Sequence, residues 1–197
     1  MLFLFLNISL VIAEIIAGIY SGSMALIADA FHNLGDVLAL FISLIAIIYG
    51  AKKASESMTF GYIKAEIMAA FINSLFLIIT MIFILVESIN RFVNPTEINA
   101  PIVIFASLIA LLINAYSTIL LKQNDIGHHH ENDEKEHHNE HADMNIKSAY
   151  LHMLGDAVIS LSVAVGGAII YFFGIVAIDS VLSVIFSIYI IKETFLY

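Results

Sequence analysis

The sequence predicts an all-α membrane protein, a bundle of six transmembrane helices with both termini in the cytoplasm. Two features of the composition support this: of 197 residues, 60% are hydrophobic and only 13% are charged, against about 25% charged in an average soluble domain. The third observation is that six apolar segments approach or exceed the length of about 20 residues that a helix needs to cross a bilayer. None of them shows the two-residue alternation of a membrane barrel strand.

The first predicted span, residues 2–20, resembles a signal peptide only in its hydrophobicity. It has no basic leading region and no A-x-A-like cleavage site, and Glu14 interrupts it, so we expect a retained membrane helix. The other spans are expected at 24–49, 65–89, 100–121, 146–172 and 175–191. Short turns join them at 21–23 and 173–174, and the connections at 51–64 and 123–145 are polar.

The basic residues predict the orientation. Arg91 is the one basic residue that falls on one side of a six-span arrangement, whereas seven lysines fall on the side of the chain ends: Lys52, Lys53, Lys64, Lys122, Lys135, Lys147 and Lys192. Because cytoplasmic loops carry the excess of Lys and Arg, we expect both termini and both polar connections in the cytoplasm. A multi-pass protein of the bacterial inner membrane is the expected setting. The chain offers no basic face for nucleic acid.

Two of the eight histidines lie inside predicted spans, and each is followed by an aspartate four residues later: His32 with Asp36, and His152 with Asp156. Residues four apart share one face of a helix. Ionisable groups inside a membrane are costly and usually mark a function. Together the two pairs offer two imidazoles and two carboxylates, which is the number of ligands that zinc takes in a tetrahedral site.

A structural interpretation competes with the metal site. A single buried histidine is more often a hydrogen-bonding partner between helices, and a His–Asp pair at this spacing could be a local hydrogen bond. Two copies on separate spans favour one shared divalent-metal site. The chain has no cysteine, so any metal is bound by nitrogen and oxygen, and copper(I) is disfavoured.

The segment SGSMALIADAFHNLGD (residues 21–36) closely resembles the signature of the cation diffusion facilitator family, in its zinc-transporting branch. The resemblance extends through all six spans, at Asn7, Glu14, 60–66, Asn73, 87–91, 150–156 and 178–179. It implies one six-helix transport domain over residues 1–197, including the 123–145 His-rich connection, usually in a homodimer. It also implies efflux of zinc by proton-coupled antiport with alternating access. His32, Asp36, His152 and Asp156 fall on the transport-site positions of the family.

The chain departs from the family pattern at its ends. Many members continue beyond the sixth span into a small cytoplasmic α/β domain, whereas this sequence stops at Tyr197. We therefore leave open a fragment, a truncated gene or a short form, and with it a zinc-binding membrane sensor that does not transport. Cadmium, cobalt or iron as the main cargo is a further alternative.

Several acidic residues are secondary candidates. Asp29 lies on roughly the same face as His32 and is either a partner or pathway residue of the site or a surface charge. Glu14 and Glu66 are expected to line a cavity or to bond Asn7 or Asn73. Glu87 and Arg91 suit a local ion pair, and Asp179 a charge at the N-terminus of its own helix.

The 123–145 connection carries the remaining histidines, His128, His129, His130, His137, His138 and His141. From 127 to 143 it has almost no apolar residues, so we expect disorder there and loose, accessory metal binding, with a plain solvated linker as the alternative.

An enzyme is disfavoured, because no His-Glu-x-x-His motif is present and four ligands leave no open position for a substrate water. No organic cofactor is expected. No Walker-type loop is present either. Because the ligands must be deprotonated to bind metal, protons suit as the counter-ion, and His32 and His152 are expected to carry part or all of that load.

Overall fold

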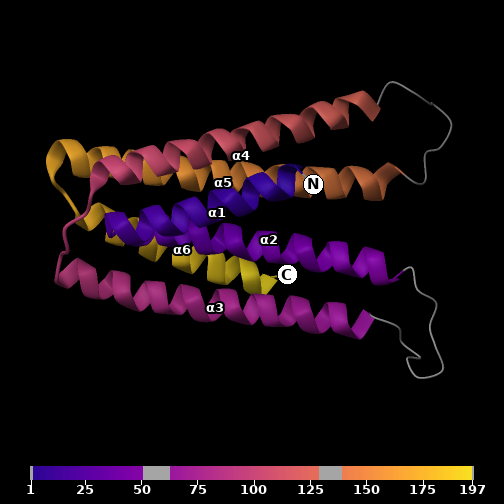
Figure 1. Ribbon diagram of the computed structural model, residues 1–197, viewed down its shortest axis with the longest axis horizontal. Helices are drawn as coiled ribbons and strands as arrows, with labels where there is room; N and C mark the ends of the chain where they lie inside the picture. Colours follow the sequence, from indigo (N-terminus) through magenta and orange to yellow (C-terminus); the bar gives the residue numbers. More distant parts are fainter. Residues whose placement is uncertain (1, 51–62, 129–138, 197) are drawn as a thin grey trace.

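The computed structural model describes residues 2–50, 63–128 and 139–196, and over these ranges the chain is helical, with no strand. Each helix runs antiparallel to the one that precedes it in the chain (Figure 1). They are α1 (Leu2–Ser21), α2 (Met24–Gly50), α3 (Ile63–Val93), α4 (Ala100–His128), α5 (Asn139–Phe173) and α6 (Ala177–Leu196).

Each predicted span corresponds to one of these helices, but the helices on either side of the His-rich connection are longer than predicted. α4 continues to His128 and α5 begins at Asn139, so the expectation of disorder from 127 to 143 is wrong at both of its ends. Hydropathy predicts where an apolar segment ends, but the backbone can remain helical beyond that point. Polar residues such as Lys and Gln are good helix formers and carry a helix beyond the apolar span.

Two glycines permit tight turns at one end of the bundle. Gly22 has φ 71° between α1 and α2, and Gly174 has φ 69° after α5. This left-handed conformation is accessible to glycine at little cost and is common where helices end. The Gly174 N–H also donates to the Ile170 carbonyl at 2.9 Å, which closes α5. We call this end the short-turn end; both chain termini lie toward the opposite end (Figure 1).

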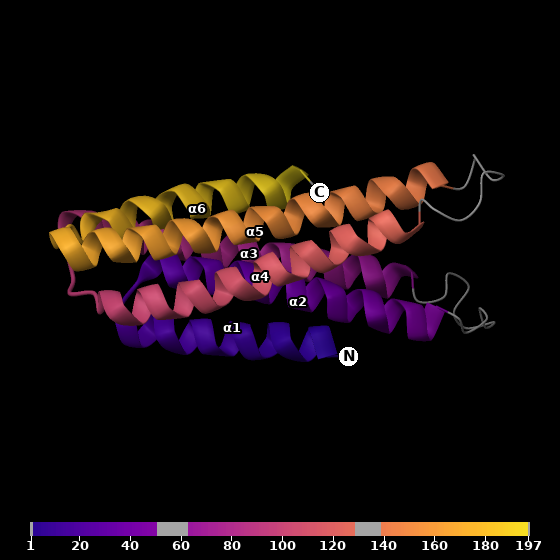
Figure 2. The same cartoon turned by 90° about the horizontal axis from the view of Figure 1, so that it is seen from above.

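The helices pack mainly in pairs: α4 with α5, α3 with α6, and α1 with α2. Toward the short-turn end, α2 packs among α3, α5 and α6 around a buried apolar cluster that includes Leu26, Met81, Val163 and Ile190. Toward the other end, the α4–α5 pair diverges from α2 and α3 (Figures 1 and 2). The bundle is therefore closed at one end and splayed at the other.

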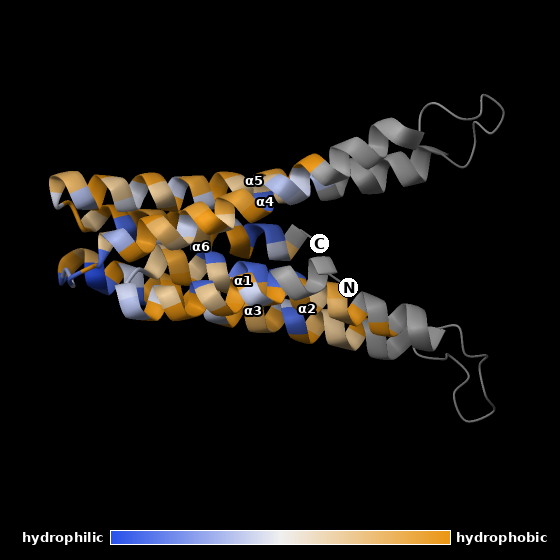
Figure 3. Ribbon diagram, turned by 45° about the horizontal axis from the view of Figure 1, so that its top comes forward, coloured by the Kyte–Doolittle hydropathy of each residue, from blue (hydrophilic) through white to orange (hydrophobic). Residues whose placement is uncertain are grey.

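The polarity of the side chains is the reverse of that in a soluble protein, with apolar residues outside and polar residues inside. Large apolar side chains such as Phe71, Phe83 and Phe105 are exposed, whereas Glu14, Asp29 and many serines are buried, and Figure 3 shows apolar residues over much of the helices. Within the described ranges, four stretches are long and apolar enough to cross a membrane, one in each of α2, α3, α4 and α5. The chain is an integral membrane protein whose outer surface suits lipid.

Asp179 stabilises a helix other than its own. Its carboxylate accepts hydrogen bonds from the Ser23 hydroxyl and, at 2.8 and 3.3 Å, from the backbone N–H groups of Met24 and Ala25. Asp179 does stand in the first turn of α6, but the bonds it makes cap α2. The structural role predicted for it is right in kind and wrong in its target, because sequence position does not show which neighbouring helix end a carboxylate can reach.

Arg91 also ties the short-turn end together. Its Nε donates to Glu87 at 2.8 Å, which confirms the predicted ion pair, and one terminal nitrogen donates to the Gly22 carbonyl at 2.7 Å. The end of α3 is thereby joined to the α1–α2 turn.

Candidate metal site

The two predicted His–Asp pairs meet between α2 and α5. His32, Asp36, His152 and Asp156 each offer one ligand atom, and these atoms all lie within 4.8 Å of one another. Both pairs are near the middle of their helices, so the cluster lies well inside the bundle. Because the two carboxylates carry a formal charge of −2 with neutral imidazoles, the cluster attracts cations.

Each histidine lies closest to the aspartate of the other helix. His32 Nε2 is 3.3 Å from Asp156 Oδ1, and His152 Nε2 is 3.3 Å from Asp36 Oδ2. The distances within each helix are longer, at 3.9 Å for both pairs. The two imidazole rings are 5.7 Å apart and meet edge to face at 76°. The arrangement is reciprocal, and neither helix alone reproduces it.

These separations are close to those of a tetrahedral zinc site. Zinc binds histidine and carboxylate at about 2.0–2.2 Å, so two ligands of one tetrahedron lie about 3.3–3.6 Å apart. The cross-helix distances already have this value, and the within-helix distances exceed it by a few tenths of an ångström. A modest contraction of the cluster would complete a four-ligand N/O site, for which zinc and cobalt are suited.

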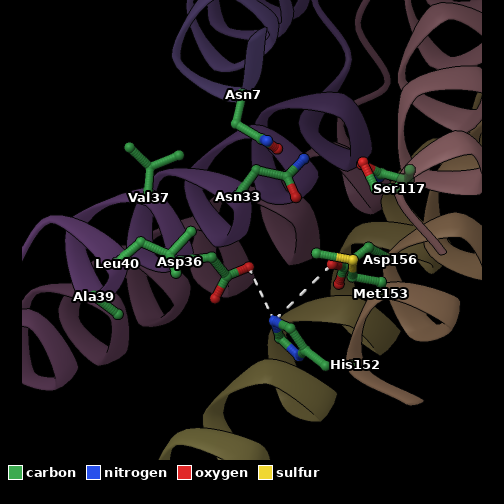
Figure 4. Close-up of a pocket in the computed structure, with 11 residues that line it drawn as sticks. Asn7, Asn33, Asp36, Val37, Ala39, Leu40, Ser117, His152, Met153 and Asp156 are labelled. Carbon is green, nitrogen blue, oxygen red and sulfur yellow. Dashed lines mark ion pairs between the residues drawn. The ribbon is translucent and has the colours of Figure 1, made fainter. Parts of the chain in front are cut away.

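A cavity of about 340 Å³ reaches the cluster from one side. It is lined by residues of α1, α2, α4 and α5, including Asn7, Leu40, Ser117 and Met153 (Figure 4). Asp36 and His152 are about one-third exposed, at 33% and 37%, whereas the His32 and Asp156 side chains are 6% and 11% exposed. Asp36 and His152 are thus the members of the cluster that are most accessible from the cavity.

Glu193 of α6 is a site residue that the sequence did not indicate. Its Oε1 lies 3.6 Å from His152 Nδ1, the ring nitrogen opposite the one that faces the cluster. Metal-binding histidines commonly present this second nitrogen to a carboxylate, which orients the ring. In the sequence, Glu193 is a charged residue beside Lys192 near the end of an apolar stretch. This position is typical of a residue at the membrane–water interface.

Two of the secondary candidates lie inside the bundle. Asp29 is fully buried, so its interpretation as a surface charge is wrong; it accepts a hydrogen bond from Ser160 of α5 at 3.0 Å. Glu14 accepts from Asn33 at 3.0 Å, whereas the expected candidates were Asn7 and Asn73. Asn73 instead donates to the Gly35 carbonyl at 3.0 Å. Helix spacing alone did not indicate which asparagine faces which carboxylate.

The remaining candidates lie near helix ends or outside the described residues. Glu66 belongs to α3, and His128 and His141 belong to α4 and α5, but the surroundings of their side chains are not described. His129, His130, His137 and His138 lie outside the described residues, so their accessory role stays a prediction.

Known proteins resemble the chain over nearly its whole length. The family described as the cation efflux transmembrane domain matches residues 1–196. The zinc transporter ZitB of Pectobacterium atrosepticum is 35% identical over 182 residues, which cover 92% of this chain and 52% of that protein. The cadmium, cobalt and zinc/H(+)-K(+) antiporter of Bacillus subtilis is 33% identical over 183 residues, which are 92% of this chain and 54% of that protein.

The metal cation efflux system protein CzcD of Cupriavidus metallidurans is 32% identical over 185 residues, covering 94% of this chain and 54% of the relative. The chain therefore spans about half the length of the curated relatives it matches.

Proposed function

Because this chain belongs to the cation efflux family, known also as the cation diffusion facilitator family, we propose that it exports zinc from the cytoplasm in exchange for protons. His32, Asp36, His152 and Asp156 bind the ion during its passage. Residues 1–197 act as one transport domain, and the ion is cargo rather than a resident cofactor. The names of the relatives, which include zinc transporters and a cadmium, cobalt and zinc antiporter, support this cargo class.

The observation that carries the proposal is the reciprocal cluster. Four nitrogen and oxygen donors from two helices lie within 4.8 Å of one another in the interior of a membrane protein. A purely structural pair of hydrogen bonds would need neither the second histidine nor the second aspartate. A partly buried group with two negative charges and no Lys or Arg ion pair among the described residues is best explained by a cation that binds there.

The cavity supports access from the cytoplasm. The residues that line it on α2, from Asn33 to Leu40, lie toward the α2 end from which the 51–62 connection departs, and Asn7 lies toward the chain start. On the other side of the cluster, Ser23, Leu26 and Ser160 are fully buried. The conformation suits loading from the side of the termini. Alternating access then requires this side to close and the short-turn end to open.

We propose that all six helices span the bilayer. α1 and α6 have 20 residues each and pack within the same bundle, and an even number of spans puts both termini on one side. The lysine excess puts that side in the cytoplasm. The setting is the bacterial inner membrane, and the unit is a homodimer, as the family resemblance implies.

Protons supply the driving force in this proposal. Moving a divalent ion outward against 100 mV, inside negative, costs about 4.6 kcal/mol, twice the cost for one elementary charge. Metal binding requires deprotonated ligands, and histidine titrates near pH 6.5. Zinc that arrives from the cytoplasm displaces protons, and protons that arrive outside displace zinc.

The His-rich connection is proposed to raise the local zinc supply without being essential. Replacement of its six histidines, His128, His129, His130, His137, His138 and His141, by serine should leave transport active with a weaker dependence on low zinc concentrations. Complete loss of transport in folded protein would exclude an accessory role.

The decisive experiment reconstitutes the chain in liposomes that enclose a zinc-sensitive fluorescent indicator, with an imposed pH gradient. Gradient-dependent flux is expected, together with its loss in Asp156→Ala. A Glu97→Gln variant, altered at an exposed connection residue, is the matched control and should transport normally. Folded protein that binds zinc but gives no flux would overturn the transport proposal and favour a sensor; flux that is indifferent to Asp156 would overturn the site.

A further inference from the structure

Two carboxyl groups outside the metal cluster are buried inside the bundle. Glu14 of α1 is 1% exposed and Asp29 of α2 is 0% exposed, and neither takes part in an ion pair among the described residues. Each has one oxygen with a donor: Asn33 donates to Glu14 Oε2 and Ser160 donates to Asp29 Oδ2, both at 3.0 Å. The other oxygens, Glu14 Oε1 and Asp29 Oδ1, are buried and have no hydrogen-bond partner within the described part of the chain.

An ionised carboxylate in this setting is strongly disfavoured. Its oxygens only accept hydrogen bonds, and a buried charge without a partner costs several kcal/mol even after relaxation. A proton on the unpartnered oxygen removes the charge and leaves only an unpaired hydroxyl, a much smaller penalty. Buried acids of this kind commonly take up a proton in place of remaining charged.

The charges of the acidic neighbours oppose ionisation of the two groups, whereas the charge of His32 favours ionised Asp29. Glu14 experiences the charges of Asp29 and Asp156, and Asp29 experiences those of Asp156, Asp36 and His32. Apart from His32, every one of these neighbours is acidic. Like charges at close range cannot all be ionised at once without cost, so a proton on this pair relieves the repulsion whenever no metal is bound.

The pair lies on the closed side of the metal cluster. Along α2, Asp29 is seven residues from the turn at Gly22, whereas His32 is ten residues from it; along α1, Glu14 is eight residues from the same turn. At about 1.5 Å per residue, the backbone position of Asp29 lies about 4.5 Å nearer to the short-turn end than that of His32, and the position of Glu14 about 3 Å nearer. The cavity approaches the cluster from the opposite direction.

We propose that Glu14 and Asp29 form a proton-binding site separate from the metal ligands, placed between the ligands and the external side. This rests on the proposed function. When the short-turn end opens, a hydronium ion transfers one proton to a carboxylate of the pair, which leaves a carboxylic acid and a water molecule. When zinc then binds to the cluster from the cytoplasmic side, its positive charge favours the carboxylate, and the acid returns the proton to water. The pair thus supplies part of the proton stoichiometry independently of His32 and His152.

The test measures protonation directly. Infrared difference spectra of the full chain in lipid nanodiscs, recorded on zinc addition and on pH steps, should contain a carboxylic-acid C=O band near neutral pH that shifts in D₂O. Glu14→Gln and Asp29→Asn should each remove part of this band, because each imitates the protonated form without carrying the proton. Glu14→Asp should retain a shifted band, and Glu97→Gln should leave the spectrum unchanged.

A second measurement separates a proton site from a merely structural one. Protons released per zinc bound, followed with a pH dye, should fall in Glu14→Gln while zinc affinity measured by calorimetry changes by less than the roughly 10–100-fold expected when a supporting residue of a metal ligand is lost. An unchanged proton count with a large loss of affinity would overturn the proposal, as would the absence of a carboxylic-acid band in folded wild-type protein.

The two proposals fail in different ways. If liposomes show no zinc flux but the band and its loss in Glu14→Gln are present, the pair binds protons and only its role in transport is refuted. If flux is present and the band is absent, export stands and the pair is structural.

Discussion

The reciprocal approach of the two His–Asp pairs has consequences for each ligand. Since each histidine lies 3.3 Å from the aspartate of the opposite helix, removal of one aspartate leaves the histidine of the other helix without its nearest partner. The ligands are therefore expected to act as one unit across α2 and α5. Effects of substitutions within such a unit are not additive.

The first prediction tests this coupling. Asp36→Asn and Asp156→Asn should each weaken zinc binding strongly, and the double variant should cost far less than the sum of both changes, because the first change has already dismantled the site. Calorimetric titration of the single and double variants measures the coupling. Independent, additive losses would contradict a shared site.

The second prediction concerns the proton load of the ligands. A His32→Asp, His152→Asp variant should lose the part of the pH dependence of transport that the two imidazoles confer. Zinc flux into liposomes measured across external pH tests this. Full flux with an unchanged pH profile in the double variant would show that the histidines carry no transported proton.

The third prediction concerns Glu193. Glu193→Gln removes the charge that faces the outer nitrogen of His152 and should lower zinc affinity, by about tenfold if it orients the ring as such partners usually do. Lys192→Gln, a change at the exposed neighbouring residue, is the control and should bind zinc normally. Equal affinities in both variants would reduce Glu193 to a surface charge.

At the scale of the helices, the most informative contact is the cap that Asp179 of α6 supplies to α2. A side-chain cap contributes about 0.5–2 kcal/mol when it satisfies one helix N-terminus. Here the carboxylate accepts from two backbone N–H groups and one hydroxyl. It fixes the start of the helix that carries His32 and Asp36.

The fourth prediction follows from this cap. Asp179→Ala should lower the free energy of unfolding by roughly 1–3 kcal/mol, because buried donors lose their acceptor. Ser23→Ala should cost less, since it removes the acceptor of one backbone group, the Leu26 N–H at 3.1 Å, and both backbone bonds to the carboxylate remain. Thermal unfolding in detergent compares the two. A smaller loss for Asp179→Ala than for Ser23→Ala would contradict the capping role.

The positions of the helices along the chain could largely be predicted from the sequence. The starts of α2 and α4 at Met24 and Ala100 coincide with the predicted spans, because each follows a turn that interrupts the apolar pattern. The four residues of the candidate metal cluster could also be proposed, since spacing within one helix reveals a shared face, and the structure brings them together. Their cross-helix pairing, the Glu193 contact and the Asp179 cap could not, because these depend on which helices become neighbours and at what height.

At the scale of the whole molecule, the lysine excess, the positions of the chain ends and the cavity agree on one orientation. The chain contains no cysteine, so single cysteines can be introduced without a background. This makes the proposed topology directly measurable.

The fifth prediction uses that property. In inside-out membrane vesicles, His137→Cys should react with an impermeant maleimide, and Thr96→Cys, at the connection between α3 and α4, should not; in right-side-out vesicles the pattern should reverse. Labelling of both from one side would exclude the six-span arrangement with cytoplasmic termini.

The separation of the four donor atoms in the cluster depends on the distance between α2 and α5. Its four donor atoms are spread over up to 4.8 Å, wider than the edge of about 3.3–3.6 Å in a tetrahedral zinc site. A smaller ion therefore draws the two helices together further than a larger one does. Discrimination between ions with the same ligand chemistry then becomes an elastic property of the bundle. Substitutions remote from the cluster, at contacts that set helix spacing, should alter which ion is preferred without touching a single ligand.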